Sequence, residues 1–241
     1  MYLSRLTLDL RSKVVRRWLS DVDQLHRDVL SAFASAPAPG EARSSLGILF
    51  RLERLRDGRL LLLVQSRTAP DWGKLPPGVL APADSFLEAI ENPAVKDVAS
   101  QWGALRPGQI LRFRLRANPT KKVDTKTGPD GRRRNGRRVE LTTEAAKIAW
   151  LKRKATQHGF DLGQISEQPE QVLDVVDVAD ADAVGYRRGA KASQGRLTFG
   201  ACVFEGTLRV SDVALFREAL ADGVGSGKAF GFGLLSIAPA G

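Results

Sequence analysis

The sequence predicts an α+β fold with antiparallel sheets, and three observations point to it. Short stretches that alternate apolar and polar residues recur along the chain, as expected of half-buried strands. Segments with apolar residues at helical spacing lie between these stretches instead of forming one block. Turn signals at Asp57-Gly58 and around Gly206 join consecutive strand candidates directly, as antiparallel pairing allows.

The first hundred residues predict the order strand, helix, strand, strand, helix. Leu6, Leu8 and Leu10 alternate with polar residues, which favours a half-buried strand. Asp21 is a suitable N-cap for the next helix, because its side chain can accept a hydrogen bond from the first turn. The expected elements are a strand over 5–10, a helix over 22–33, a hairpin of strands over 47–54 and 59–66, and a helix over 83–91.

The second half of the chain repeats this order. Thr142 or Thr143 is expected to cap its first helix, and Ser211 its second. The expected elements are strands over 109–118 and 172–178, a helix ending near 157, a hairpin-like pair over 197–204 and 208–210, a helix over 213–221 and a strand over 234–237. Two βαββαβ units in one chain predict tandem ferredoxin-like (RRM-like) domains, 1–103 and 104–241.

The composition excludes several classes of protein. Of the 241 residues, 43% are hydrophobic, which is enough for a core and excludes a fully disordered chain. The single cysteine, Cys202, excludes an intrachain disulfide, and one Cys with two His cannot build a Cys/His zinc site. No apolar run approaches the roughly 20 residues of a membrane-spanning helix, and no signal-peptide core follows the N-terminus. We therefore expect a cytoplasmic protein with no membrane contact, metal site or cofactor.

Positive charge is concentrated in one segment of the chain. The sequence has 37 Lys and Arg against 27 Asp and Glu, and residues 119–138 alone hold eight basic and two acidic residues. Because this segment contains Gly128-Pro129-Asp130-Gly131, it can be a solvated loop, a loop that orders on a phosphate backbone, or each in turn. The residues expected to bind RNA here and on the preceding strand are Arg116, Lys121, Lys122, Arg132, Arg133, Arg134, Arg137 and Arg138.

A glycine-rich segment precedes the last predicted strand. Gly223, Gly225, Gly231 and Gly233 frame it, and Lys228 lies between the two glycine pairs. The segment lacks the spacing of a Walker A loop, and it leads from a helix into a strand, which is the reverse of a Rossmann fingerprint. Two interpretations stay open. The segment is a loop that needs several positive φ angles, or a backbone that a phosphate or another chain approaches closely, with Lys228 adding charge.

Several motifs, taken together, resemble one protein family. They are Leu25-His26-Arg27, Pro70-Asp71-Trp72, the run Phe113-Arg114-Leu115-Arg116-Ala117-Asn118-Pro119 and the ending Gly231-Phe232-Gly233-Leu234-Leu235-Ser236. Over nearly its whole length the chain resembles the CasE-type CRISPR repeat-RNA endoribonucleases of the type I-E Cascade complex, members of the repeat-associated superfamily. The resemblance implies two ferredoxin-like domains and metal-independent cleavage of a CRISPR repeat hairpin by 2′-OH attack, which leaves 2′,3′-cyclic phosphate and 5′-OH ends. It also implies that the mature crRNA stays bound and that other Cascade subunits are partners.

A histidine suits the proton transfers of such a reaction, because its pKa is near neutrality. The chain has two, His26 and His158. His158 precedes Gly159 at the end of a predicted helix, where a C-cap role is expected. His26 lies one residue off the apolar stripe of its helix, and by pattern alone it would border the core. The resemblance implies instead that His26 is the catalytic histidine.

The catalytic surroundings of His26 depart from the family in one position. The family often has a tyrosine three residues before this histidine, and here that residue is Asp23. One helical turn apart, Asp23 could orient the imidazole and hold it cationic, or Tyr2 or Tyr186 could replace the tyrosine. The resemblance also implies cations from a second-domain hairpin near the scissile phosphate. The candidate cations are Arg27 beside His26, then Arg187, Arg188 and Lys191, of which Lys191 is assigned to catalysis.

Other functions remain open at the level of sequence. One is a catalytically silent subunit of the same complex that binds the RNA hairpin. Another is a general or ribosome-associated RNA-binding protein that only docks through its basic segment. A nucleotide-binding enzyme is disfavoured, because the glycine-rich segment fits neither phosphate-loop pattern. The free protein is expected to be a monomer.

Overall fold

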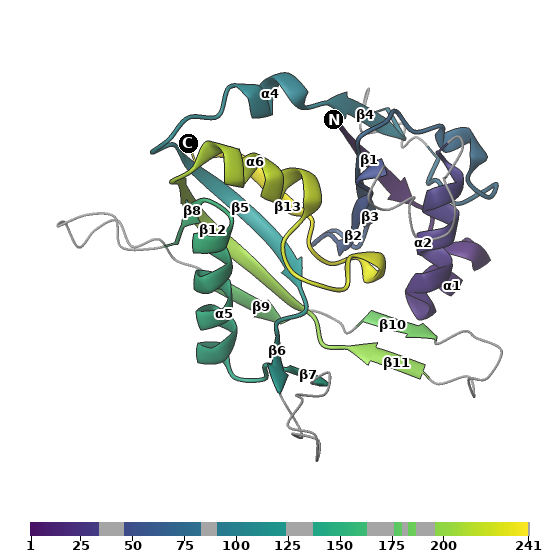
Figure 1. Ribbon diagram of the computed structural model, residues 1–241. Coiled ribbons are helices and arrows are strands. Elements are labelled where there is room, and N and C mark those ends of the chain that lie inside the picture. The colour runs from purple at the N-terminus through teal and green to yellow at the C-terminus, as the bar shows by residue number, and fades with distance from the viewer. Residues whose placement is uncertain are drawn as a thin grey trace, which may run out of the picture.

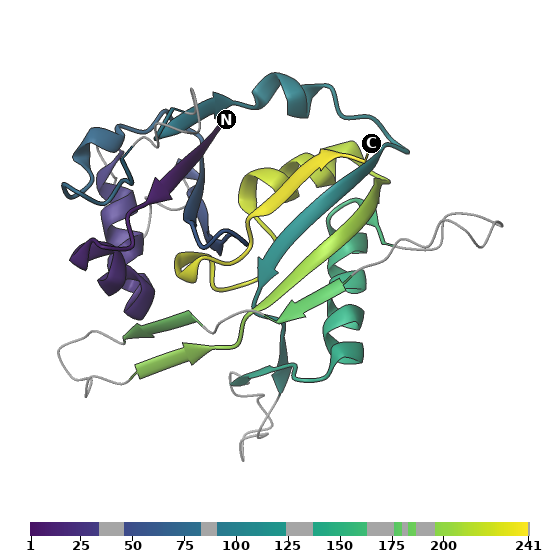
Figure 2. The same cartoon turned by 180° about the vertical axis from the view of Figure 1, so that it is seen from behind.

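The chain folds into two antiparallel sheets that lie side by side, each with helices packed against it (Figure 1). The computed structural model describes residues 1–33, 46–82, 91–123, 137–162, 176–179, 183–186 and 196–240. Helix α6 and the glycine-rich segment lie between the two sheets (Figures 1 and 2). The architecture is therefore α+β, as the sequence predicts.

The N-terminal sheet has the strand order β2-β3-β1-β4, which is the order of a ferredoxin-like βαββαβ unit. Ser4, Leu6 and Leu8 alternate toward the core on the first strand, and the turn to the third strand passes through Gly58 at φ +85°. The elements are β1 (Tyr2–Leu8), α1 (Lys13–Ser20), α2 (Val22–Ser31), β2 (Leu49–Arg54), β3 (Leu60–Ser66), a 3-10 turn η1 (Trp72–Lys74), β4 (Ala94–Asp97) and a short helix α4 (Ala99–Gly103).

The C-terminal sheet follows the same path, in the order β13-β5-β12-β8, with β9 also paired to β12. Two short ribbons, β6–β7 and β10–β11, extend beyond it (Figure 2). The elements are β5 (Ile110–Ala117), β6 (Thr120–Val123), β7 (Arg137–Glu140), α5 (Glu144–Gln157), β8 (Phe160–Asp161), β9 (Val176–Ala179), β10 (Ala183–Tyr186), β11 (Arg196–Phe199), β12 (Cys202–Val210), α6 (Val213–Asp222), a 3-10 turn η2 (Lys228–Phe230) and β13 (Leu235–Pro239).

Each sheet has a hydrophobic core of its own. Trp18 and Leu25 pack under the N-terminal sheet, and Phe204 and Phe216 lie in the C-terminal core. Phe232 comes from the glycine-rich segment near the end of the chain, yet it is buried in the N-terminal core. The glycine-rich segment therefore fastens the two halves together by hydrophobic packing.

Most predicted elements are confirmed, and two predictions are wrong. The hairpin expected around Gly206 does not exist, because β12 runs unbroken through Gly206, which pairs with Phe113 of β5 and has no positive φ. Helix α6 is capped by the Asp212 side chain, not by Ser211. Helix α1 was not predicted from the sequence, and the two ends of the basic segment pair as β6 and β7.

Other expectations lie where the structure does not test them. The helix expected over 83–91 falls almost wholly outside the described residues, as does the first part of the strand expected over 172–178. The domain boundary near residue 103 coincides with the end of α4 and stays a prediction. In the part of the chain that the structure describes, every helix is too short or too polar to cross a bilayer.

Candidate functional site

His26 lies on α2, a helix whose start is fixed by the Asp21 cap. The Asp21 side chain accepts a hydrogen bond from the Asp23 N–H, as predicted, and Val22, Leu25 and Val29 form the buried stripe. This stripe leaves His26 half-buried at the edge of the core. Helix α2 contacts both η2 and β10, so the predicted catalytic helix, the glycine-rich segment and a second-domain ribbon meet here.

The imidazole of His26 stacks on a phenylalanine ring. The centroids of His26 and Phe50 are 5.9 Å apart, and the ring planes are inclined by 21°. Phe50 is on β2 and is only 1% exposed, so it forms a fixed floor for the imidazole. The Nδ1 atom of His26 is buried as well.

Asp23 and Arg27 form an ion pair on the same helix. The Arg27 Nη1 atom lies 2.9 Å from Asp23 Oδ2, and Arg27 Nη2 donates to Gln24 Oε1 at 2.6 Å. Both side chains of the pair are about one-third exposed, at 36% for Arg27 and 29% for Asp23. Arg27, which follows His26 in the chain, is thus a cation with a carboxylate partner. That Asp23 orients the His26 imidazole and holds it cationic stays a prediction.

The glycine-rich segment adopts the backbone that its composition predicts. Gly223, Gly225, Gly231 and Gly233 all have φ between +79° and +91°. The Val224 N–H donates to the carbonyl of Gly233, which folds the segment back on itself. A Cβ on Gly223 would lie 2.8 Å from that same carbonyl oxygen, so the two strands of the loop can approach only without side chains.

Arg116, expected to bind RNA, lies behind this loop. It is 8% exposed, its guanidinium is 4.8 Å from the centroid of the Phe232 ring, and its carbonyl accepts a hydrogen bond from Gly233. These contacts support the glycine-rich loop from the C-terminal sheet. A direct contact of Arg116 with RNA stays a prediction.

The described part of the basic segment is the β6–β7 ribbon. Lys121, Lys122 and Arg138 are exposed on it, and Arg138 Nη1 lies 3.4 Å from Thr120 Oγ1. Arg137 belongs to β7. Three further predicted cations, Arg132, Arg133 and Arg134, lie outside the described residues, as do Arg187, Arg188 and Lys191.

Sequence reasoning missed cations on two helices. On α5 they include Arg153 and Lys154, and burial first of all, then the charges of Arg153 and Arg138, lowers the pKa of Lys154. On α1, the exposed cations are Lys13, Arg16 and Arg17. An amphipathic pattern with buried Val15 and Trp18 was the available signal for α1, but the dense positive charge obscured it.

His158 has the structural role that the sequence predicts. It is the C-cap of α5, and its N–H donates to the carbonyls of Lys154 and Ala155. Burial lowers the pKa of His158, and the charges of Lys154 and Lys228 act in the same direction.

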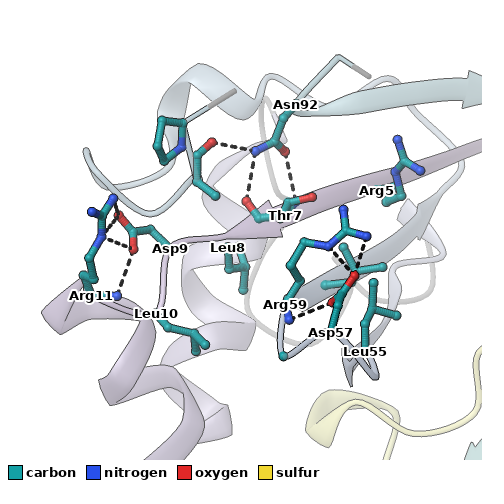
Figure 3. Close-up of a pocket in the computed structure, with 14 residues that line it drawn as sticks. Arg5, Thr7, Leu8, Asp9, Leu10, Arg11, Leu55, Asp57, Arg59 and Asn92 are labelled. Atoms are coloured by element: carbon teal, nitrogen blue, oxygen red, sulfur yellow. Dashed lines mark hydrogen bonds and ion pairs between the residues drawn. The ribbon is translucent and has the colours of Figure 1, made fainter. Parts of the chain in front are cut away.

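A cavity of about 530 Å³ lies elsewhere, between the end of β1 and the β2–β3 turn (Figure 3). Asn92 closes one side by accepting from the Thr7 N–H and donating to the Thr7 carbonyl (Figure 3). Asp57, whose pKa is lowered by its hydrogen bonds to Arg59, balances that cation. None of the predicted catalytic or RNA-binding residues lines this cavity, so it is not the candidate active site.

The comparisons with known proteins match nearly the whole chain to CRISPR-associated proteins. A family model described as CRISPR associated protein matches residues 1–239. The chain is 36% identical over 241 residues to the CRISPR-associated endoribonuclease Cse3 of Thermus thermophilus, and the match covers 99% of this chain and 100% of that protein. It is 29% identical over 243 residues to the CRISPR system Cascade subunit CasE of Escherichia coli, again with 99% and 100% coverage.

A solved structure extends this likeness to the fold. The structure of Thermus thermophilus Cse3 bound to an RNA representing a pre-cleavage complex matches with a TM-score of 0.71 at 33% identity. The match covers 99% of this chain and 98% of that one. The likeness therefore extends over nearly the whole chain, with both sheets included.

Proposed function

This chain belongs to the family of CRISPR-associated proteins, and on that premise we propose that it is an endoribonuclease that cleaves CRISPR repeat RNA. The observation that carries the proposal is the position of His26: it is half-buried and stacked on Phe50, and it lies on α2, the helix that contacts η2 and β10. The likeness to Cse3 bound to a pre-cleavage RNA supports it. We further propose that the product stays bound and that the protein works as a subunit of a Cascade complex, as the name of its Escherichia coli relative states for that protein.

The proposed reaction uses the RNA itself as nucleophile. The ribose 2′-OH loses its proton and attacks the adjacent phosphorus, which forms a 2′,3′-cyclic phosphate as the P–O5′ bond breaks. The departing O5′ takes a proton and becomes a 5′-OH end. His26 transfers a proton in this step through its Nε2 edge, since Nδ1 is buried. No divalent ion is needed for the attack, so we propose a metal-independent reaction.

Positive charge must accompany this proton transfer, because the phosphorane carries additional negative charge. Arg27, paired with Asp23, is the described cation nearest to His26 in the chain. We assign Lys191 to the same task, with Arg187 and Arg188 as RNA contacts, on the strength of the family resemblance. Tyr186, on the ribbon that contacts α2, is a candidate for the role that a tyrosine has in relatives.

The stem of the repeat hairpin is proposed to lie against the β6–β7 ribbon. A-form RNA has a deep and narrow major groove, so phosphate contacts and shape dominate its recognition. Lys121, Lys122 and Arg138 are exposed on the ribbon, where they can pair with phosphates. The glycine-rich loop with Lys228 would lie closer to the scissile end, because η2 contacts α2.

The decisive experiment uses purified protein, a repeat hairpin RNA and an excess of chelator. We expect cleavage with a 2′,3′-cyclic phosphate end, and its loss on His26→Ala and on 2′-deoxy substitution at the cut. His158→Ala is the matched control, because His158 caps α5 and is expected to leave the cleavage step intact. Cleavage that persists in His26→Ala, or that needs added metal, would refute the proposed mechanism.

A second candidate function is a silent subunit that binds the hairpin without cutting it. One observation favours it: the charge of Arg27 is balanced by Asp23, at the position where relatives often have a tyrosine. Tight hairpin binding without any cleavage would establish this alternative. For either function we propose a cytoplasmic protein that is a monomer when free and that folds as two domains meeting near residue 103.

A further inference from the structure

Phe50 is a neighbour of both the His26 imidazole and the glycine-rich loop. One neighbour of its ring is the imidazole of His26, at a centroid distance of 5.9 Å. Another is the backbone of Gly231: a Cβ built on Gly231 would be 3.2 Å from Phe50 Cε2 and 3.6 Å from Cδ2. The 3.2 Å separation from Cε2 is shorter than ordinary carbon contacts, so the phenyl ring packs closely against the loop at Gly231.

The loop itself is held from both sides at this point. Gly231 has φ +79° and ends η2, with its N–H directed at the Lys228 carbonyl. The next residue, Phe232, is fully buried in the N-terminal core, and Arg116 lies over its ring. Gly231 thus cannot retreat from Phe50 without disturbing a buried aromatic side chain.

We propose that Phe50 is a positioning residue for His26 and that Gly231 fixes Phe50 in that role. The glycine-rich loop would then orient the catalytic imidazole from behind, in addition to any contact that it makes with RNA. This inference rests on the proposed function and adds to it a second role for the loop. The physical reason is that proton transfer requires the imidazole within a few tenths of an ångström of its partner, and a misplacement of about 1 Å can cost about 100-fold in rate.

The first test replaces the phenyl ring. Phe50→Leu removes the stacking surface, and we expect the single-turnover rate at saturating hairpin RNA to fall by about tenfold or more. The Kd for a hairpin with a 2′-deoxy cut site should change by less than about twofold, because Phe50 is only 1% exposed. Phe50→Met, whose unbranched and flexible side chain fills an irregular gap more readily, serves where the leucine variant folds poorly.

The matched control is Phe33→Leu. Phe33 lies in the same hydrophobic core, is 4% exposed and makes an edge contact with Trp72 instead of with a histidine. The Phe33→Leu variant is expected to be destabilised about as much as the Phe50→Leu variant, and to retain the wild-type cleavage rate. A role of Phe50 in stability alone would make the two variants equal in rate.

The second test adds a methyl group to the loop. Gly231→Ala should slow cleavage by pressing on Phe50, and Gly58→Ala is its control, because Gly58 has a similar φ of +85° but nothing within 4 Å of the added Cβ. In the double variant, Phe50→Leu makes room for the methyl group. The combined loss in rate should therefore be smaller than the product of the two single losses.

Nuclear magnetic resonance gives a readout that does not depend on cleavage. The chain has only two histidines, so a His158→Gln background leaves one imidazole signal, that of His26. Phe50→Leu should shift that signal by removing the ring current of the phenyl group, and Phe33→Leu should leave it in place.

The outcomes separate the two proposals. If the wild-type protein does not cleave, the proposed function fails. If His26→Ala cleaves like wild type, the proposed mechanism fails. The positioning role fails in both cases. If the wild type cleaves through His26 but Phe50→Leu, Phe50→Met and Gly231→Ala match their controls in rate, only the positioning role is overturned. A slower Phe50→Leu with unchanged RNA affinity, a shifted His26 signal and non-additive coupling to Gly231→Ala supports it.

Discussion

The buried guanidinium of Arg51 donates a hydrogen bond to the carbonyl oxygen of Leu234, with the two atoms 2.8 Å apart. The donor is on β2 of the N-terminal sheet, and the acceptor directly precedes β13 of the C-terminal sheet. The same side chain also reaches the Arg114 carbonyl and Ser236 Oγ, and its charge is balanced by Glu53. Burial lowers the pKa of Arg51, while Glu53 opposes that shift. One residue thus connects the two sheets near the glycine-rich loop.

Arg51→Ala is expected to destabilise the protein by about 3–5 kcal/mol, because it leaves Glu53 and the partner carbonyls without their buried cation. The measurement is urea unfolding of the free protein. Arg59→Ala is the control: its ion pair with Asp57 is substantially exposed, so the loss of stability there should be much smaller. Equal losses in the two variants would show that Arg51 is not a structural link between the sheets.

Asp23→Asn is expected to lower the single-turnover cleavage rate. The substitution removes the carboxylate that lies 2.9 Å from Arg27 Nη1 and one turn before His26. Arg27 and His26 therefore both lose a neighbouring negative charge. Stability should fall by only about 0.5 kcal/mol, which is typical of an i,i+4 ion pair. Asp28→Asn on the same helix, where Asp28 binds Trp18 and Gln24, is the control. An unchanged cleavage rate in Asp23→Asn would remove Asp23 from the mechanism.

The strands were predictable because their buried residues recur at every second position. The alternation of Leu6 and Leu8 on β1 is visible within one segment of sequence, and so is the turn at Gly58. Gly206 misled the same reasoning, since a glycine can lie within a strand as well as at a turn. Only the pairing with β5, which is distant in sequence, distinguishes the two cases.

The candidate site was less accessible to sequence reasoning. The family resemblance predicted that His26 is catalytic. The helical spacing of apolar residues around His26 indicates only a residue at the border of the core. The stacking of His26 on Phe50, and the contact of Phe50 with Gly231, join residues from three distant parts of the chain. No local spacing encodes such contacts, because they depend on how the two sheets pack together.

Neutralising the described cations of the β6–β7 ribbon should weaken hairpin binding and its dependence on salt. In the triple variant Lys121→Gln, Lys122→Gln, Arg138→Gln, we expect the slope of log K against log salt to decrease in magnitude by about two to three, roughly one per lost phosphate contact. Neutralising the five arginines Arg132, Arg133, Arg134, Arg137 and Arg138 should act in the same direction. The measurement is hairpin affinity at several salt concentrations.

The control for the ribbon variant removes three exposed cations from the N-terminal half of the chain: Arg54 on β2, Arg56 in the β2–β3 turn and Lys96 on β4. It changes the net charge by the same amount without touching the ribbon. A slope that falls equally in both variants would mean that overall charge, and not the ribbon, determines binding.

The stability of the free protein should decrease as the pH falls from about 7.5 to about 5.5, and His158 should account for part of that decrease. Burial, together with Lys154 and Lys228, lowers the pKa of His158 in the folded protein below its ordinary value of 6.5. The unfolded chain therefore binds a proton first as the pH falls, and the free energy of unfolding falls with it. The contribution is fully present above the unfolded pKa and is lost as the pH drops through it toward the folded pKa.

The measurement compares urea midpoints at the two pH values for wild type and for His158→Gln. The variant cannot gain a proton at this position, so its midpoint should fall less between pH 7.5 and 5.5 than that of wild type. Lys228→Gln should lie between the two, because it removes one of the charges that disfavour the imidazolium while the burial of His158 remains. If the three proteins lose stability equally over this range, His158 does not titrate differently in the folded and unfolded states, and the decrease has another origin.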